Sequence, residues 1–269
     1  MPADRTPLHV DNSLILFKEK VMPEYLEPEE IPLAGGRITA GVMRVGETVR
    51  RPLGGLTDLS VHLLRHFEQI GFTGAPRYLG RDQAERDILT YIPGWVPTKF
   101  QYFRDEQIFA AGTLIRQFHD ATRGSSLARS SAVVCHNDPA PNNAVFQNEM
   151  PVAFIDFDMV SPGDPLEDLG YMAWLWCVSS KPERAPVSKQ AGQVRVLADA
   201  YGLDATSRST LVEAMLERQS RNATFWTDRL SDFHGPPTSQ AQMRERVRWS
   251  EVEKDFVNRH REEFDGALR

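Results

Sequence analysis

Cysteine is scarce in this 269-residue sequence, which contains only Cys135 and Cys177. Two cysteines are too few for a cysteine-rich metal cluster, and a single disulfide would be a weak framework for a chain of this size. The longest strongly apolar stretch, Tyr171 to Val178, is far shorter than the roughly 20 residues that a membrane span needs. No basic segment followed by an apolar run begins the chain, so we expect no signal peptide, no membrane partner and a cytoplasmic location.

The sequence also lacks an excess of positive charge. It has 31 Lys and Arg against 37 Asp and Glu, which gives a net charge of −6. Nucleic-acid binding requires a concentrated excess of basic residues, so we expect no nucleic-acid partner. Hydrophobic residues at 41% and charged residues at 25% are ordinary for a globular protein and exclude a disordered or collagen-like chain.

The pattern of secondary structure changes near Pro93-Gly94. Before this point, the sequence predicts short strands at 37–42 and 46–51, joined through 44–47, a helix with Thr57 as its N-cap, and a strand at 87–92. After it, helical periodicity dominates, with one β-rich interruption at 132–158. The expected helices cover 105–123, 166–178, 188–201, 207–230 and 240–264. We therefore predict an α+β fold with an N-terminal lobe at 1–93 and a helical C-terminal lobe at 94–269.

Two short motifs carry the strongest chemical signal. The first is His136-Asn137-Asp138-Pro139-Ala140-Pro141-Asn142-Asn143, and the second is Ile155-Asp156-Phe157-Asp158. Between them the chain predicts a β-hairpin with strands at 143–147 and 152–156. A hairpin returns to its starting point, so we expect Asp156 to lie beside the loop that holds Asp138 and Asn143.

Phosphoryl transfer needs such a set of oxygen-bearing side chains. A carboxylate orients the attacking hydroxyl and accepts its proton, while hard oxygen ligands hold Mg²⁺ against the triphosphate. We predict that Asp138 takes the first role and that Asn143 and Asp156 take the second. His136 is expected to brace the catalytic loop through hydrogen bonds to the backbone, without transferring a proton. Asp158 is either a second metal ligand or a turn carboxylate.

These motifs resemble the aminoglycoside phosphotransferase and choline kinase branch of the kinase-like fold. In that family the loop is typically His-Gly-Asp, four residues and Asn, and the metal motif is Ile-Asp-Trp/Phe followed by an acid; here Asn137 replaces the usual Gly. The segments 162–170 and 114–119 are similar to further family motifs, and the Gly-Gly-Arg…Val-Gly-Glu-Thr-Val-Arg-Arg-Pro run resembles a bacterial subgroup of trifolitoxin-immunity-like phosphotransferases. The resemblance implies a two-lobed, protein-kinase-like fold with a small antiparallel-sheet N-lobe and a mostly helical C-lobe.

The resemblance also implies that the N-lobe binds ATP, as co-substrate with Mg²⁺, and that the acceptor is a hydroxyl of a small molecule. Gly35 and Gly36 would lie at the turn over the phosphates, and the backbone of Thr90, Tyr91 and Ile92 would bind adenine. Kinases place a Lys on the third strand, paired with a helix Glu. The matching strand, 48–52, has no Lys, so Arg50 or else Arg51 must replace it, and the helix after Thr57 lacks a Glu in its middle.

Other polar residues have structural alternatives. The resemblance implies that Asp164 supports the metal loop and Asp168 the next helix, whereas Gly-Asp-Pro is also strong turn chemistry. His119 is expected to be a packed or capping histidine, and Trp174 and Trp176 are expected to belong to the core. Trp226, near Asp228 and Asp232, either walls an acceptor pocket for a cationic or hydroxyl-rich substrate or belongs to an amphipathic surface helix. The mixed charges at 244–263 indicate a solvated helix face.

The sequence leaves two rival functions open. The altered Lys and Glu positions favour a binding or immunity protein that keeps the fold but transfers no phosphate. A metal-dependent hydrolase could use the same acids, although no residue obviously positions a water. The acceptor's identity and the oligomeric state are not readable from these residues.

Overall fold

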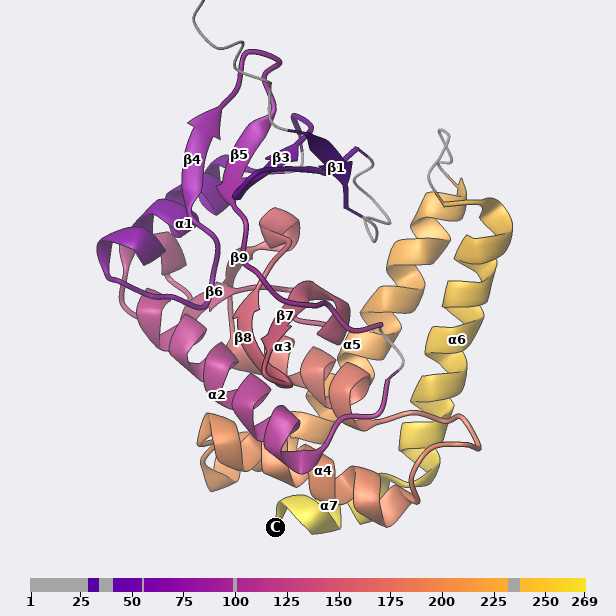
Figure 1. Ribbon diagram of the computed structural model, residues 1–269. Coiled ribbons are helices and arrows are strands. Elements are labelled where there is room, and N and C mark those ends of the chain that lie inside the picture. Colours follow the sequence, from indigo (N-terminus) through magenta and orange to yellow (C-terminus); the bar gives the residue numbers. More distant parts are fainter. Residues whose placement is uncertain (1–28, 34–40, 55, 99–100, 232–237) are drawn as a thin grey trace, which may run out of the picture.

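An antiparallel sheet forms the N-terminal part of the chain, and helices form most of the rest (Figure 1). The computed structural model describes residues 29–33, 41–54, 56–98, 101–231 and 238–269. The sheet has five strands in the order β1-β2-β3-β5-β4, and each neighbouring pair is antiparallel. The strands are β1 (Glu30–Pro32), β2 (Met43–Val45), β3 (Thr48–Arg51), β4 (Tyr78–Arg81) and β5 (Asp87–Thr90).

The first hairpin is displaced from its predicted position. β2 begins at Met43 and turns at Gly46, whose φ of 59° lies in the left-handed region that glycine adopts without strain. Of the predicted strand at 37–42, residues 37–40 lie outside the described residues and the rest precede β2. β1 and β4 were not predicted, because all three residues of β1 are exposed and carry no alternating pattern, and β4 contains a glycine.

The helix under the sheet begins where the sequence predicts. α1 (Asp58–Gln69) has Thr57 as its N-cap, and Thr57 and Ser60 form a reciprocal capping box. Leu63, Leu64 and Phe67 lie on the buried face of α1. The Ser60 hydroxyl also donates a 2.8 Å hydrogen bond to the carbonyl of Phe157, which ties α1 to a segment far along the chain.

The chain crosses from the sheet to the helical part against a strand of the second part. Trp95 and Phe146 exchange backbone hydrogen bonds of 3.1 and 2.8 Å, and the Gln147 amide donates to the Pro93 carbonyl at 2.7 Å. Gly94 has φ 147°, and a Cβ there would lie 2.4 Å from the Phe146 carbonyl oxygen. Only glycine fits this crossing, which explains why the change in sequence pattern near Pro93-Gly94 coincides with it.

Two small antiparallel ladders interrupt the helical part. They are β6 (Val133–Cys135) with β9 (Ser161–Gly163), and β7 (Ala144–Gln147) with β8 (Met150–Phe154). The β7–β8 turn is shorter than predicted, because Asn148 and Glu149 both take positive φ and close it in two residues. The predicted hairpin is therefore present, whereas β9, which pairs with β6, was not predicted.

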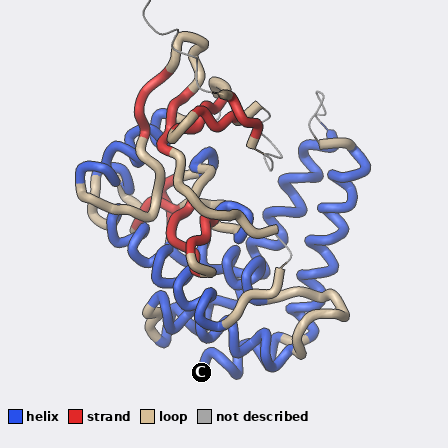
Figure 2. The backbone as a smooth tube through the Cα atoms, in the orientation of Figure 1, coloured by secondary structure: helices blue, strands red, loops and turns tan. Residues whose placement is uncertain are grey.

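Helices surround these ladders (Figure 2). The helices are α2 (Asp105–Thr122), α3 (Pro165–Met172), α4 (Val187–Tyr201), α5 (Ala205–Ser231), α6 (Gln240–Arg259) and α7 (Arg261–Leu268). α3 continues into a π-helical turn, Ala173–Cys177, and the helix predicted at 240–264 is broken at His260. α5 and α6 pack side by side along one flank (Figure 1). Trp174 and Trp176 belong to the core, as expected.

Both cysteines are buried and unbridged. Burial raises the pKa of Cys135 and of Cys177 well above the usual range of a thiol. These side chains therefore pack as small neutral groups. None of the helices in the described parts of the chain is long and apolar enough to span a membrane.

Candidate active site

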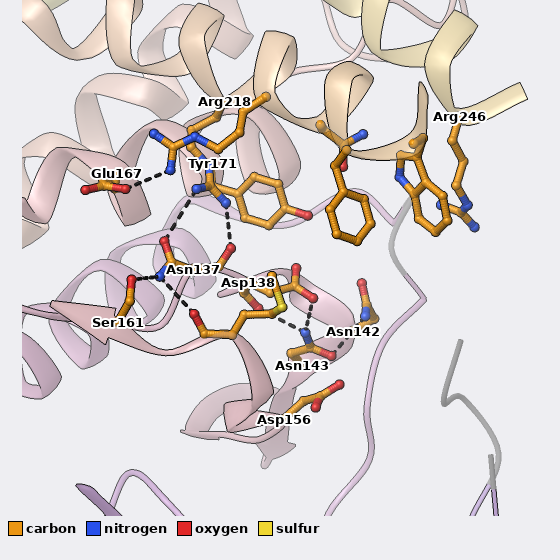
Figure 3. A pocket seen from close by; sticks show the side chains of 15 residues that line it. Asn137, Asp138, Asn142, Asn143, Asp156, Ser161, Glu167, Tyr171, Arg218 and Arg246 are labelled. Atoms are coloured by element: carbon orange, nitrogen blue, oxygen red, sulfur yellow. Dashed lines mark hydrogen bonds and ion pairs between the residues drawn. The ribbon is translucent and has the colours of Figure 1, made fainter. Parts of the chain in front are cut away.

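The β7–β8 hairpin brings the two sequence motifs together. The loop of residues 136–143 follows β6, and Asp156 follows β8 after one residue. The Ile155 N–H donates a 2.9 Å hydrogen bond to the Asn143 carbonyl, so the end of the hairpin meets its beginning. Asp138, Asn143 and Asp156 accordingly line one cavity of about 360 Å³ (Figure 3). The convergence expected from spacing alone is present in the structure.

Asp138 and Asn143 are held by each other. The Asn143 amide nitrogen donates to the Asp138 carboxylate Oδ2 at 2.8 Å and to the Asp138 backbone carbonyl at 2.9 Å. The Asn142 amide donates to Asn143 Oδ1 at 3.0 Å. Asn143 is 5% exposed and lines the cavity, and these hydrogen bonds hold its amide in a fixed orientation.

The arginine at the end of β3 meets the second motif. Arg51, which is buried, donates from one terminal nitrogen to Asp156 at 3.1 Å and to Asp158 at 2.7 Å. Arg50 points to the opposite side of the strand, where it pairs with Asp82 at 3.5 Å and donates to the Thr48 hydroxyl. Of the two arginines left open by the sequence, only Arg51 faces the loop that carries Asp156.

Asp156 combines an unusual backbone with an accessible side chain. Its φ and ψ are both 69°, in the left-handed region, which aspartate tolerates better than most residues. The Asp156 side chain is 43% exposed and lines the cavity. The Asp158 side chain is 19% exposed and lies against Arg51, and Asp158 is not among the described residues that line this cavity.

His136 lies behind the loop and does not line the cavity. It is fully buried, its Nδ1 accepts from the Asp138 N–H at 3.3 Å, and its Nε2 lies 3.2 Å from the Ile155 carbonyl. This pairing requires the neutral tautomer with the proton on Nε2. The imidazole thus joins the backbones of both motifs, in the geometry that bracing of the loop requires.

Asp168 holds the loop of residues 136–143 in place, whereas the resemblance implies that it supports the next helix. Its carboxylate accepts from the backbone N–H groups of His136 and Asn137, each at 2.7 Å, and from His119 at 2.9 Å. Burial acts to raise the pKa of Asp168, but the His119 hydrogen bond and the other donors outweigh it and hold the pKa below its usual range. His119 also contacts the Tyr201 hydroxyl at 3.0 Å.

The roles that the resemblance implies for Asp164 and Asp168 were wrong: Asp164 caps a helix, and Asp168 holds the catalytic loop. Asp164 is the N-cap of α3 and accepts from the Leu166 N–H at 2.8 Å, so it stabilises the helix. Asp168, one turn into that helix, reaches the loop. The Gly-Asp-Pro sequence therefore forms a turn and a helix cap, in agreement with the structural alternative given for it.

Asn137 replaces the glycine of the family motif without losing the loop conformation. Its φ is 65°, which glycine adopts freely and asparagine tolerates. The Asn137 amide donates to the Met159 carbonyl at 2.9 Å and to the Ser161 hydroxyl at 2.8 Å. The side chain therefore adds bonds between the loop and the segment after Asp156 that a glycine could not make.

The structure shows which of the backbone N–H groups expected to bind adenine already have partners within the chain. The N–H groups of Thr90 and Tyr91 donate to the carbonyls of Arg77 and Glu47, each at 2.9 Å, so they are not available to a ligand. Within the described segments, the Ile92 amide makes no backbone hydrogen bond. Gly35 and Gly36 lie outside the described residues.

The wall of the cavity opposite the loop was not predicted. It is formed by Glu167 and Tyr171 of α3, by five residues of α5 and by Arg246 of α6; the α5 residues are Arg218, Arg221, Asn222, Phe225 and Trp226. Trp226 is present as one interpretation expected, but the carboxylates expected beside it are not: Asp228 is exposed and Asp232 lies outside the described residues. Arginines are found instead. In the sequence, the spacing of these arginines resembles that of a solvated helix face. Only the packing of α5 against α3 and α6 shows that they line a cavity.

Comparison with known proteins is consistent with this architecture. Residues 42–203 match the profile of the phosphotransferase enzyme family. The trifolitoxin immunity protein of Rhizobium leguminosarum bv. trifolii is 27% identical over 269 residues, which covers 89% of this chain and 99% of that relative.

Solved structures share the fold at low identity. A choline/ethanolamine kinase family protein from Mesorhizobium loti superposes with a TM-score of 0.57 at 16% identity, over 96% of this chain and 96% of that chain. A spectinomycin phosphotransferase, crystallised with ADP and spectinomycin, gives 0.58 at 13% identity, over 84% and 91%. A choline kinase from Cryptosporidium parvum Iowa II gives 0.57 at 12% identity, over 93% and 95%.

Proposed function

This chain belongs to the phosphotransferase enzyme family, and from that premise we propose that it transfers the γ-phosphoryl group of ATP to a hydroxyl of a small molecule. The observation that carries the proposal is the convergence of Asp138, Asn143 and Asp156 on one cavity. Phosphoryl transfer depends on positioning and on charge stabilisation, and these three side chains offer a base and hard oxygen ligands in one place.

Asp138 is the proposed catalytic base. As the acceptor oxygen attacks the γ-phosphorus and the bond to ADP breaks, the hydroxyl proton passes to the Asp138 carboxylate. The Asn143 amide fixes Asp138 Oδ2 at 2.8 Å, which leaves the carboxylate in one orientation. His136 and Asp168 act as positioning residues, because they hold the backbone on either side of the base.

The donor set fits Mg²⁺. The Asn143 amide oxygen and the Asp156 carboxylate are hard oxygen ligands that line the same cavity, so these two would hold the ion. Bound Mg²⁺ would neutralise phosphate charge during transfer. Asp158 lies against Arg51, so we assign it to orienting that arginine rather than to the metal.

Arg51 is the proposed replacement for the kinase lysine. Its guanidinium lies between the sheet and Asp156, and its fork of donors suits phosphate oxygens. We assign residues up to 93 to nucleotide binding, with the Ile92 amide as the adenine contact, and residues from 94 to catalysis and acceptor binding. A cytoplasmic location remains part of this proposal.

Substitution of the base separates binding from transfer. With Mg²⁺ and ATP, acceptor-dependent ADP release should fall about 10²- to 10⁴-fold in Asp138→Asn, whereas thermal stabilisation by Mg²⁺-ATP should stay near that of the parent chain. Near-normal turnover by Asp138→Asn with an identified acceptor would overturn the role given to Asp138. An Asp199→Asn variant, altered on the exposed side of α4, is the matched control.

A second candidate is a binding or immunity protein that transfers no phosphate. The observation in its favour is that Arg51 already occupies the carboxylates of Asp156 and Asp158. The relation to a trifolitoxin immunity protein adds to it. Stabilisation by ATP, with no acceptor-dependent ADP release across a broad panel, would support this candidate against the enzyme.

A further inference from the structure

The cavity beside Asp138 carries three arginines on the wall that faces the loop. One of them, Arg221, already has its counter-charges: it pairs with Glu167 at 2.8 Å and with Glu217 at 2.9 Å. Arg221 is about half exposed, at 46%, so these are ordinary surface ion pairs. The charge of Arg221 is therefore accounted for within the chain.

Arg218 is different because it is buried without a carboxylate. It is 7% exposed, it donates to the Asn137 carbonyl at 2.6 Å, and its guanidinium lies 4.7 Å from the centre of the Tyr171 ring (Figure 3). Its Nε is buried and makes no hydrogen bond, and in the described ranges no carboxylate oxygen lies within 4.0 Å of it. A buried guanidinium that lacks a counter-ion is costly, so such a group is typical of a site that an anion completes.

The acids that line this cavity have partners other than Arg218. The Asp138 carboxylate accepts from the Asn143 amide, Asp156 pairs with Arg51, and Glu167 pairs with Arg221. Among the described residues, none of these acids forms an ion pair with Arg218. A molecule that enters the cavity would supply the counter-charge.

Arg246 adds a second positive charge on the same side. Its guanidinium lies 5.1 Å from the centre of the Trp226 ring. Burial and the charge of Asp138 raise the pKa of Tyr171, and the charges of Arg218 and Arg246 oppose this rise. Both guanidinium groups thus lie within electrostatic range of the tyrosine that stands beside the base.

We propose that the acceptor is a small hydroxylated acid, whose carboxylate or phosphate oxygens bind Arg218 and Arg246 while its hydroxyl faces Asp138. This rests on the phosphoryl transfer proposed above. Arg218 holds the backbone of the residue directly before Asp138, so the anion and the reacting hydroxyl of a productive acceptor are only a few bonds apart. Phe225 and Trp226 cover its carbon skeleton. A cationic amine in the same place would face like charge.

The test compares acceptors that share a hydroxylated carbon skeleton and differ in the charged group that they carry. One series is glucuronate, glucose 6-phosphate, glucose and glucosamine, and the other is glycerate, glycerol 3-phosphate, glycerol and 3-amino-1,2-propanediol. With Mg²⁺ and ATP, we expect kcat/KM for an acid of at least one series to exceed that of its neutral analogue about tenfold or more, with the amine lowest. Which acid is preferred distinguishes carboxylate from phosphate. A neutral or cationic acceptor that outperforms both acids would overturn the inference.

Variants test whether Arg218 causes the preference for acidic acceptors. Arg218→Gln should abolish the preference of acid over neutral analogue, Arg218→Lys should keep part of it, and Arg248→Gln, altered on the exposed side of α6, should match the parent chain. The ratio is decisive because damage to the loop would lower both rates together. A preference that survives in folded Arg218→Gln overturns the inference.

A binding measurement separates this inference from the proposed function. In Asp138→Asn without ATP, at least one of the four acids should raise the melting temperature, and the added Arg218→Gln change should remove that shift. If no acceptor releases ADP but this shift is seen and lost as described, the anion site stands and phosphoryl transfer fails. If neither acid of either series gives a shift or turnover, the anion site itself is wrong.

Discussion

Asn143 is joined to Asp138 twice by one amide group, which donates to the Asp138 carboxylate at 2.8 Å and to the Asp138 backbone carbonyl at 2.9 Å. The five-residue separation therefore does more than place two polar groups in one loop. It lets one side chain set the rotamer of the other, so loss of Asn143 affects the base as well as the metal ligand.

Asn143→Ala should accordingly lower kcat by about 10²-fold or more and raise the Mg²⁺ concentration needed for half-maximal rate. Steady-state rates measured over a Mg²⁺ titration test both effects. Asn258→Ala, made at an exposed position of α6, should change neither. A normal Mg²⁺ requirement in Asn143→Ala would argue against its assignment as a ligand.

Arg51→Met should weaken binding of Mg²⁺-ATP about tenfold or more, because the arginine offered to phosphate is lost. The same change removes the Arg51 ion pair from the Asp156 carboxylate, so Mg²⁺ alone should stabilise Arg51→Met more than the parent chain. Among the described residues, Arg50 contacts Asp82 and Thr48 and not the second motif, so Arg50→Met is the matched control. Calorimetric titration and thermal shifts measure the two effects, and equal losses in both variants would contradict the assignment.

Asp168 should make stability depend on acid pH. Its pKa is lower in the folded chain than the value of about 3.9 in an unfolded one, so its contribution is complete above that value and is lost as the pH falls through the folded pKa. Asp168→Asn should cost about 3 kcal/mol at neutral pH, and the difference from the parent should shrink below about pH 4.

Urea unfolding at several pH values measures this. Asp199→Asn, which alters the ion pairs of a half-exposed carboxylate, should cost less than about 1 kcal/mol. A cost for Asp168→Asn that stays constant down to strongly acid pH would mean that the carboxylate charge is not what holds the loop.

Gly170 and Gly192 make a matched pair of helical glycines. A Cβ on Gly170 would lie 2.6 Å from the backbone of Ala214, where α3 meets α5, whereas a Cβ on Gly192 of α4 would meet nothing within 4 Å. Gly170→Ala should destabilise by about 1–3 kcal/mol, and Gly192→Ala should be neutral or stabilise by about 0.5 kcal/mol. Because α3 and α5 form one wall of the cavity, only Gly170→Ala should also weaken acceptor binding.

Local chemistry made part of this site predictable. The hairpin between Asn143 and Asp156 is encoded by short-range signals, so the meeting of these residues with Asp138 followed from spacing. The Thr57 cap and the face of α1 followed in the same way. The family resemblance supplied the fold that the structural comparisons show.

Long-range packing explains what the sequence did not reveal. The partners of Arg51 depend on where the sheet lies relative to a loop more than 100 residues later in the chain. Arg218 and Arg246 lie on helices whose charged residues recur at surface-like spacing, and their cavity depends on the packing of α5 against α3 and α6. Asp168 could equally have served its own helix, since nothing in its local sequence indicates which carboxylate reaches back to the loop.

The two buried, unbridged cysteines have a practical consequence. Neither thiol meets solvent in the folded chain, and burial keeps both protonated. A maleimide dye should therefore label the native protein very slowly and the denatured protein at two sites. A single cysteine introduced on the exposed side of α6 would give one fluorophore at one known place, with no need to remove the natural thiols first.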